Sequence, residues 1–188
     1  MPDSRNDNLF DTDTYVFKAK FLDNVSVEIW CHSSFNSYNA AKAYADKLCP
    51  CLGKLPAIQL GMLDHVVIHM GDAIAFSETE GHFLVLYSQN MDARISTNDL
   101  EETVFHESVH TSIQDIYENS LAWKNAQSAD GSFITDYAHR FPHLEDMSET
   151  ALFAFTMIKY PGRLSPDIEE WMKKNIPNRL GFFRELYQ

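Results

Sequence analysis

The sequence is poor in cysteine and in basic residues, and it has no long hydrophobic run. Its three cysteines, Cys31, Cys49 and Cys51, are an odd set and do not indicate a disulfide framework. The longest apolar runs, residues 83–87 and 151–155, have five residues, far fewer than the roughly 20 that a membrane-spanning helix needs. The 15 Lys and Arg against 27 Asp and Glu give a net charge of −12. This acidity argues against nucleic acid and anionic membranes as partners, because both attract clustered cations.

The remaining composition is that of a globular protein. A chain of 188 residues with 45% hydrophobic and 22% charged residues predicts one domain. Residues 1–13 are polar and contain four aspartates, so we expect a flexible acidic arm there, followed by a single domain over residues 14–188. The arm lacks the cationic start and apolar stretch of a secretory signal, which slightly favours the cytoplasm.

The order of the predicted elements indicates the fold class. Alternating apolar, β-branched and aromatic residues predict strands at residues 14–17, 25–30, 65–70, 73–76 and 82–88. An alanine-rich helix is expected over residues 36–48, ended by Pro50. Because strands come first and helices later, the sequence predicts an α+β fold with a helical C-terminal part.

The helical part is expected to begin at Asn98, which can form a capping pair with Glu101. Further helices are predicted to start near His143 and after Ser165, where Pro166 is a favourable first helical residue.

Residues 106–110 read His-Glu-Ser-Val-His, the pattern HExxH. On a helix, residues four apart are separated by about 40°, so His106 and His110 share a face on which two neutral imidazoles can bind zinc. Glu107 is offset by about 100° and can accept a proton from a water molecule whose pKa a metal lowers. The alternative is a chance match, with both histidines satisfied in the core. Phe105 and Val109 beside them favour a packed helix, in which buried polar side chains are costly unless they bind a partner.

A third ligand must come from another segment. The extended motif HExxHxxGxxH is excluded, because Ile113 and Ile116 stand where it requires Gly and His. Glu145 and Glu149 are four residues apart and share a helix face. Glu145 can complete a His/His/Glu set with a fourth position left for water, and Glu149 can accept a hydrogen bond from a ligand histidine. Asp146 and Glu149 remain alternative third ligands.

These segments resemble the gluzincin branch of zinc metallopeptidases, and more narrowly the small single-domain relatives of the lethal factor protease domain. The resemblance depends on HESVHTS at 106–112 and on DYAHRFPHLEDMSE at 136–149, with a weaker likeness over residues 54–88. It implies a zincin-like fold, in which an edge strand of a mixed β-sheet runs above the HExxH helix. Residues 82–88 are the expected edge strand.

The resemblance also implies a role for each matching residue. It implies one zinc ion per chain, bound by His106, His110 and Glu145. It further implies general base catalysis by Glu107, support of a ligand by Glu149, and an oxyanion-facing role for Tyr137. His139 and His143 are alternative oxyanion donors. His65 and His69 are expected on a solvated strand face rather than in a second metal site.

The sequence therefore predicts a zinc-dependent peptidase that acts on a peptide or protein substrate. The main alternative is a non-catalytic zinc-binding interaction module of the same fold, which a closed four-ligand site would indicate. A zinc hydrolase acting on a non-peptide amide is a third interpretation, because the same chemistry permits it.

Overall fold

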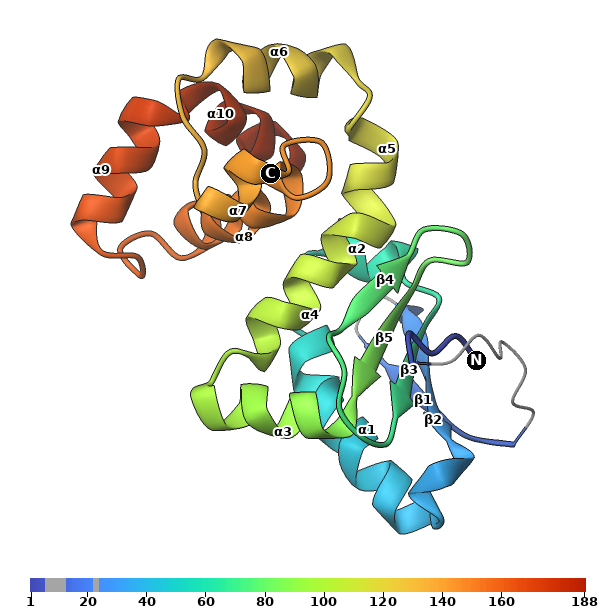
Figure 1. Ribbon diagram of the computed structural model, residues 1–188. Helices are drawn as coiled ribbons and strands as arrows, with labels where there is room; N and C mark the ends of the chain where they lie inside the picture. The colour runs from blue at the N-terminus through green and yellow to red at the C-terminus, as the bar shows by residue number, and fades with distance from the viewer. Residues whose placement is uncertain (6–12, 22–23) are drawn as a thin grey trace. The chain divides into compact units, whose positions relative to one another are not determined.

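The computed structural model describes residues 1–5, 13–21 and 24–188 (Figure 1). The chain divides into two compact units, Met1–Ser112 and Ile113–Gln188. The predicted α+β class with a mixed sheet is confirmed. Over the described part of the chain, no helix is both long and apolar enough to cross a membrane.

The first unit is built on a five-stranded open sheet with the strand order β1-β2-β3-β5-β4. Its strands are β1 (Thr14–Lys20), β2 (Ser26–His32), β3 (His65–His69), β4 (Phe76–Glu78) and β5 (Phe83–Tyr87). The three central strands β2, β3 and β5 are parallel, whereas β1 and β4 pair antiparallel with their neighbours. The sheet is therefore mixed, with β1 and β4 at its edges.

The predicted edge strand is wrong. Residues 82–88 contain β5 (Phe83–Tyr87), which lies between β3 and β4 and has all five of its side chains buried. An unbroken apolar run is typical of a strand that is covered on both faces, so it belongs inside the sheet. The strand predicted at residues 73–76 lies instead at Phe76–Glu78. It pairs with β5 from Phe76 opposite Val85 onward and forms the edge of the sheet.

Helices α1 (Tyr38–Leu52), α2 (Ala57–Met62), α3 (Ser88–Thr97) and α4 (Leu100–Val109) complete the first unit. Helix α1 packs against β1 and β2, and α4 packs against β4 and β5. The alternate strand residues beneath these helices are fully buried or nearly so, namely Val27, Ile29, Cys31, Val66, Ile68, Leu84 and Leu86. The period of two along each strand thus places one apolar row against α1 and α4.

Two predicted helix boundaries in this unit are wrong. Pro50 lies inside α1, which continues to Leu52, because proline fits helical φ and removes only one backbone hydrogen bond. Burial of Cys51 and Leu52 offsets that loss. Asn98 ends α3 in a left-handed conformation, with φ of 62°, and Asp99 takes the cap position of α4. Asparagine adopts this conformation more readily than most residues, so it suits a helix end as well as a helix start.

The other row of strand side chains contains the two histidines of β3, and the prediction of a solvated face is wrong for both. The His65 ring lies between those of Trp30 and Phe83, at centroid distances of 4.1 and 4.7 Å. His69 is 2% exposed, and its Nε2 lies 2.7 Å from the backbone oxygen of Pro2. Burial lowers the pKa of both imidazoles. These rings are packing groups of the sheet.

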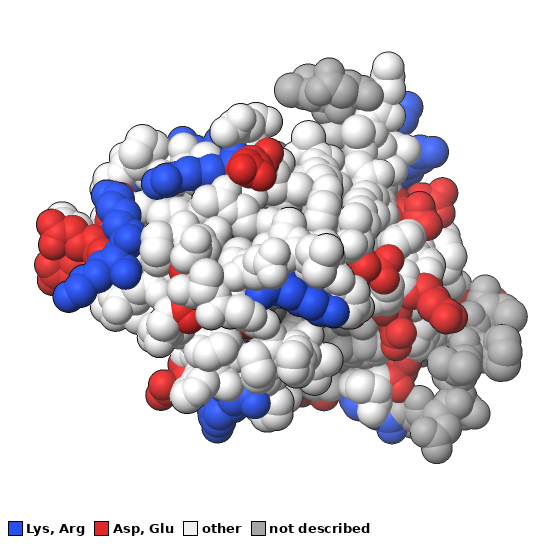
Figure 2. Space-filling model, turned by 90° about the horizontal axis from the view of Figure 1, so that it is seen from above, with Lys and Arg blue, Asp and Glu red and all other residues white. Residues whose placement is uncertain are grey.

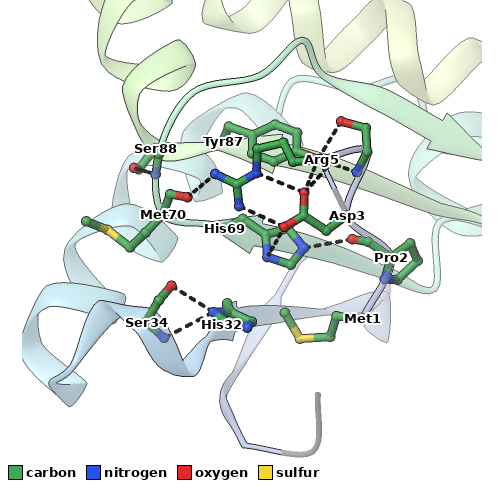
Figure 3. Close-up of polar contacts among 12 residues, drawn as sticks. Met1, Pro2, Asp3, Arg5, His32, Ser34, His69, Met70, Tyr87 and Ser88 are labelled. Atoms are coloured by element: carbon green, nitrogen blue, oxygen red, sulfur yellow. Dashed lines mark hydrogen bonds and ion pairs between the residues drawn. The ribbon is translucent and has the colours of Figure 1, made fainter. Parts of the chain in front are cut away.

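The first five residues lie against this same row (Figure 3). The Asp3 carboxylate accepts hydrogen bonds from the Arg5 side chain and, at 3.1 Å, from the Tyr87 hydroxyl. The Arg5 guanidinium holds the pKa of Asp3 well below its usual range. The prediction of a flexible arm over residues 1–13 did not include these contacts, and residues 6–12 of that arm lie outside the described residues.

The second unit is helical. It contains α5 (Asp115–Tyr117), α6 (Leu121–Ala129), α7 (Asp136–Arg140), α8 (Asp146–Lys159), α9 (Pro166–Asn175) and α10 (Pro177–Leu186). Helix α10 packs against α6 and α8, and α7 packs against α8. The predicted start of α9 is confirmed, because the Ser165 hydroxyl accepts a hydrogen bond from Ile168 N and Pro166 takes the first turn. The helix predicted to start near His143 is α8, which begins at Asp146.

Candidate metal centre

The HExxH residues lie on α4 and in the π-helical turn η3 (His110–Gln114) that follows it. The Nε2 atoms of His106 and His110 are 3.1 Å apart, and the two rings meet at 71°. Both side chains are half-buried. Two nitrogen ligands of a tetrahedral zinc ion lie about 3.3 Å apart when each Zn–N distance is 2.0–2.1 Å. The predicted pairing of the two histidines is confirmed, and its spacing fits two ligands of one ion.

Small hydroxyl residues occupy the buried side of the same helix. Ser108 is fully buried, and its hydroxyl donates to the Phe105 carbonyl at 2.7 Å and lies 3.2 Å from Gln59 Oε1. The hydroxyls of Thr111 and Ser112 both donate to the Ser108 carbonyl. Hydroxyls that bond to carbonyls one turn back compete with the backbone and bend helices. This competition accounts for the change from α- to π-helix at the second histidine.

The carbonyl of Thr111 also receives a hydrogen bond from outside the helix. His82 Nδ1 lies 2.7 Å from it, and because a carbonyl only accepts, this nitrogen carries the proton. His82 precedes β5 in the turn after β4 and has a φ of 45°. Sequence reasoning missed this residue, because nothing local connects it to a helix 29 positions further along the chain.

In the second unit, Glu145 takes the cap position of α8. The Tyr137 hydroxyl donates to Glu145 Oε1 at 3.0 Å, and the Ser148 hydroxyl donates to the Glu145 carbonyl at 2.9 Å. Tyr137 thus contacts the predicted third ligand. Of the alternative oxyanion donors, His139 stacks on Phe133 and His143 is exposed.

Asp146, an alternative third ligand, belongs to a buried network. It is fully buried, and its Oδ1 accepts from Arg179 at 2.5 Å and from Thr150 at 3.1 Å, while Oδ2 accepts from Gln127 at 2.8 Å. Burial raises the pKa of Asp146, and these hydrogen bonds oppose the shift. Asp146 is therefore the buried partner of the Arg179 cation, whereas Glu145 is only half-buried and accepts from neutral hydroxyls, which favours Glu145 as the residue that can bind a metal.

Glu149 and Glu107 have partly buried side chains. Glu149 Oε2 accepts from the Thr135 hydroxyl at 2.9 Å, and the same hydroxyl oxygen caps α7 by accepting from Ala138 N. This bond anchors the start of α7 to α8. The predicted contact of Glu149 with a ligand histidine and the base role of Glu107 stay predictions.

Among the described residues, His106, His110 and Glu145 form a group that could hold a metal ion, because one ligand atom of each lies within 4.8 Å of the others. Two imidazoles and one carboxylate are the donor set that the sequence predicted. Comparison of the chain with family models, with curated proteins and with solved structures finds no match. The assignment of a candidate metal centre therefore depends on the geometry of this chain alone.

Proposed function

We propose that this protein is a zinc-dependent peptidase of the gluzincin type, with a zincin-like fold related to that of the small single-domain relatives of the lethal factor protease domain. The observation that carries the proposal is the 3.1 Å separation of the His106 and His110 Nε2 atoms within an HExxH helix. This spacing is close to the roughly 3.3 Å expected between two imidazole nitrogens that bind one tetrahedral zinc ion.

The donor set supports zinc as the ion. Catalytic zinc sites use three protein ligands drawn from histidine and carboxylate, with one position left for water or substrate. His106, His110 and Glu145 supply such a set. The buried bonds of Asp146 to Arg179, Thr150 and Gln127 make it the less suitable ligand.

Zinc bound there would polarise a substrate carbonyl and lower the pKa of a water molecule. Glu107 follows the first ligand on the helix, and its carboxylate accepts the proton of the attacking water and passes it to the leaving amine. The Tyr137 hydroxyl has one proton, which it donates to Glu145 in this structure. It would exchange that bond for one to the developing oxyanion. These residues carry out proton transfer and charge stabilisation.

A peptide or protein substrate is favoured by the sheet edge beside the metal helix. Helix α4 packs against β4, which is the edge strand on that side of the sheet. A strand at a sheet edge can pair with an extended peptide through its backbone. This mode of binding suits a peptide better than a small non-peptide amide.

Elemental analysis of the purified, reconstituted protein tests the proposal. We expect about one zinc per chain in the wild type, loss of zinc in His110→Ala and strong weakening of binding in Glu145→Ala, since each removes a ligand. Glu107→Gln should keep zinc and abolish peptide hydrolysis, because it removes only the base.

A wild-type protein that takes up no zinc would contradict the proposal. Zinc uptake with no difference in hydrolysis between the wild type and Glu107→Gln, measured on a peptide library, would instead indicate the non-catalytic interaction module.

A further inference from the structure

We propose that His82 is a positioning residue, which anchors the π-helical turn after α4 and thereby holds the His110 imidazole beside that of His106. The inference deepens the proposed function and rests on it where zinc is concerned. Three observations within the first unit carry it, namely the fixed backbone of the β4–β5 turn, the direction of the hydrogen bond to Thr111, and the disturbed hydrogen bonding of the helix at that point.

The turn that presents His82 is held from both sides. His82 N donates to the Thr79 carbonyl at 3.1 Å, and the His82 carbonyl accepts from Asp64 N at 3.0 Å. Gly81 and His82 both have positive φ, of 91° and 45°. A non-glycine residue in this region is uncommon and persists where its surroundings determine its conformation. The His82 imidazole therefore extends from a backbone whose conformation is fixed.

The hydrogen bond of the His82 imidazole reaches the backbone of Thr111, the residue that follows His110. His82 Nδ1 donates to the Thr111 carbonyl over 2.7 Å. A bond to the backbone fixes the main chain itself, and the main chain at Thr111 is covalently continuous with the residue that carries the second imidazole. Anchoring this carbonyl therefore limits how far His110 can move from His106, whose Nε2 is 3.1 Å away.

The helix needs such an anchor at this point. The hydroxyls of Thr111 and Ser112 bond to the Ser108 carbonyl, which in an α-helix would serve only the backbone N–H one turn later. The helix widens to a π-turn over His110–Gln114. Single π-turns are rare in proteins, and many of those that do occur lie at functional sites. His82, in the turn before β5, donates to this segment and stabilises its conformation without itself being a metal ligand.

The test compares His82→Gly with His82→Asn. Both residues accept positive φ, but only asparagine keeps a donor near the place of Nδ1. Asn98→Gly is the matched control, because Asn98 has a φ of 62° at the end of α3 and does not contact η3 through its side chain in any described bond. Two quantities are measured, namely amide hydrogen exchange over residues 106–114 in chelator-treated protein, and zinc affinity by competition with a chelating dye.

We expect His82→Gly to exchange faster over residues 106–114 and to bind zinc about 10–100-fold more weakly, the usual effect of losing a group that orients a ligand. His82→Asn should restore both quantities to near wild type, and Asn98→Gly should change neither. A turn residue with only a structural role would lower thermal stability without this local pattern or its rescue. If His82→Gly does not fold, His82→Asp replaces it in the exchange measurement, because aspartate has the shape of asparagine but only accepts.

Wild-type exchange and zinc affinity in His82→Gly would overturn the inference, as would failure of His82→Asn to restore them. Absence of zinc binding in the wild type would contradict the proposed function instead, and the exchange comparison alone would then decide whether His82 anchors the turn.

Discussion

The Tyr137 hydroxyl has one proton, which it donates to Glu145 Oε1 at 3.0 Å, so donation to an oxyanion would require that this bond be released during the reaction. Tyr137→Phe keeps the ring and removes only the donor. We expect zinc affinity to fall about 10–100-fold through loss of support for the ligand. At saturating zinc, kcat should still fall about 10²–10³-fold, or ~2.7–4 kcal/mol, through loss of the oxyanion donor. Unchanged affinity and kcat, with stability lower by ~1 kcal/mol, would show a structural hydroxyl.

Arg179 bonds to Asp146 in the first turn of α8. Its fully buried guanidinium bonds to Asp146, Asp130 and the Ser132 carbonyl. Arg179→Met leaves buried carboxylates without a counter-charge, so the free energy of unfolding should fall by about 3–5 kcal/mol. Urea denaturation measures this. Arg184→Met, on the exposed side of the same helix, is the control and should change stability by less than about 0.5 kcal/mol. Equal effects of the two substitutions would contradict the prediction.

At the scale of elements, α1 contains a local conflict between sequence and structure. Pro50 is exposed and lies inside the helix, where it removes one backbone hydrogen bond. Pro50→Ala should therefore raise the free energy of unfolding by about 1–3 kcal/mol, since alanine restores the bond and no packing is lost. Ala43→Gly, also exposed on α1, should lower it by about 1 kcal/mol. Thermal unfolding of both variants checks the prediction, which a destabilised Pro50→Ala protein would refute.

Elements with a strong local pattern could be predicted from the sequence. Alternation along β2 and β3 and the Ser165-Pro166 start of α9 depend on neighbouring residues, and the structure confirms them. The edge position of β4 could not be predicted, because it depends on which strands pair across the sheet. The end of α3 at Asn98 was missed because asparagine suits both ends of a helix.

The same division applies to the candidate site. The pairing of His106 and His110 follows from helix periodicity, and four-residue spacing was enough to find it. The choice of Glu145 over Asp146 required the bonds of Arg179, a residue 33 positions away. The support of the π-turn by His82 depends on a contact across 29 positions. Local patterns thus identify ligands, whereas the groups that orient them come from tertiary structure.

At the scale of the whole molecule, the net charge of −12 comes from acidic residues spread along the sequence. Figure 2 shows acidic and basic side chains interspersed with neutral ones. Several acidic groups have basic partners, as in the Lys47–Asp92 and Lys54–Glu101 pairs. Exposed pairs of this kind contribute little stability each and are weakened by salt. These ion pairs are therefore not expected to dominate the stability of the protein.

The pH dependence of stability should instead come from two histidines of the sheet, the half-buried His65 and the buried His69. Burial lowers the pKa of His65 and His69 in the folded protein, although Asp64 and Glu28 oppose the shift at His65. In the unfolded chain a histidine binds its proton near pH 6.5. As the pH falls from 7 toward 5, the unfolded state therefore takes up protons that the folded state does not. The free energy of unfolding should decrease, by at most ~1.4 kcal/mol per pH unit for each such histidine.

His65→Phe separates this effect from packing. Phenylalanine keeps an aromatic ring between Trp30 and Phe83, where the His65 ring stacks, and it cannot take a proton. We expect the variant to lose less stability than the wild type between pH 7 and pH 5, measured by urea denaturation with a chelator present so that zinc release does not contribute. His143→Phe, at an exposed histidine, should keep the wild-type slope. If His65→Phe and the wild type show the same slope, His65 is not a source of the acid sensitivity, and His69 beside Asp3 becomes the residue to replace.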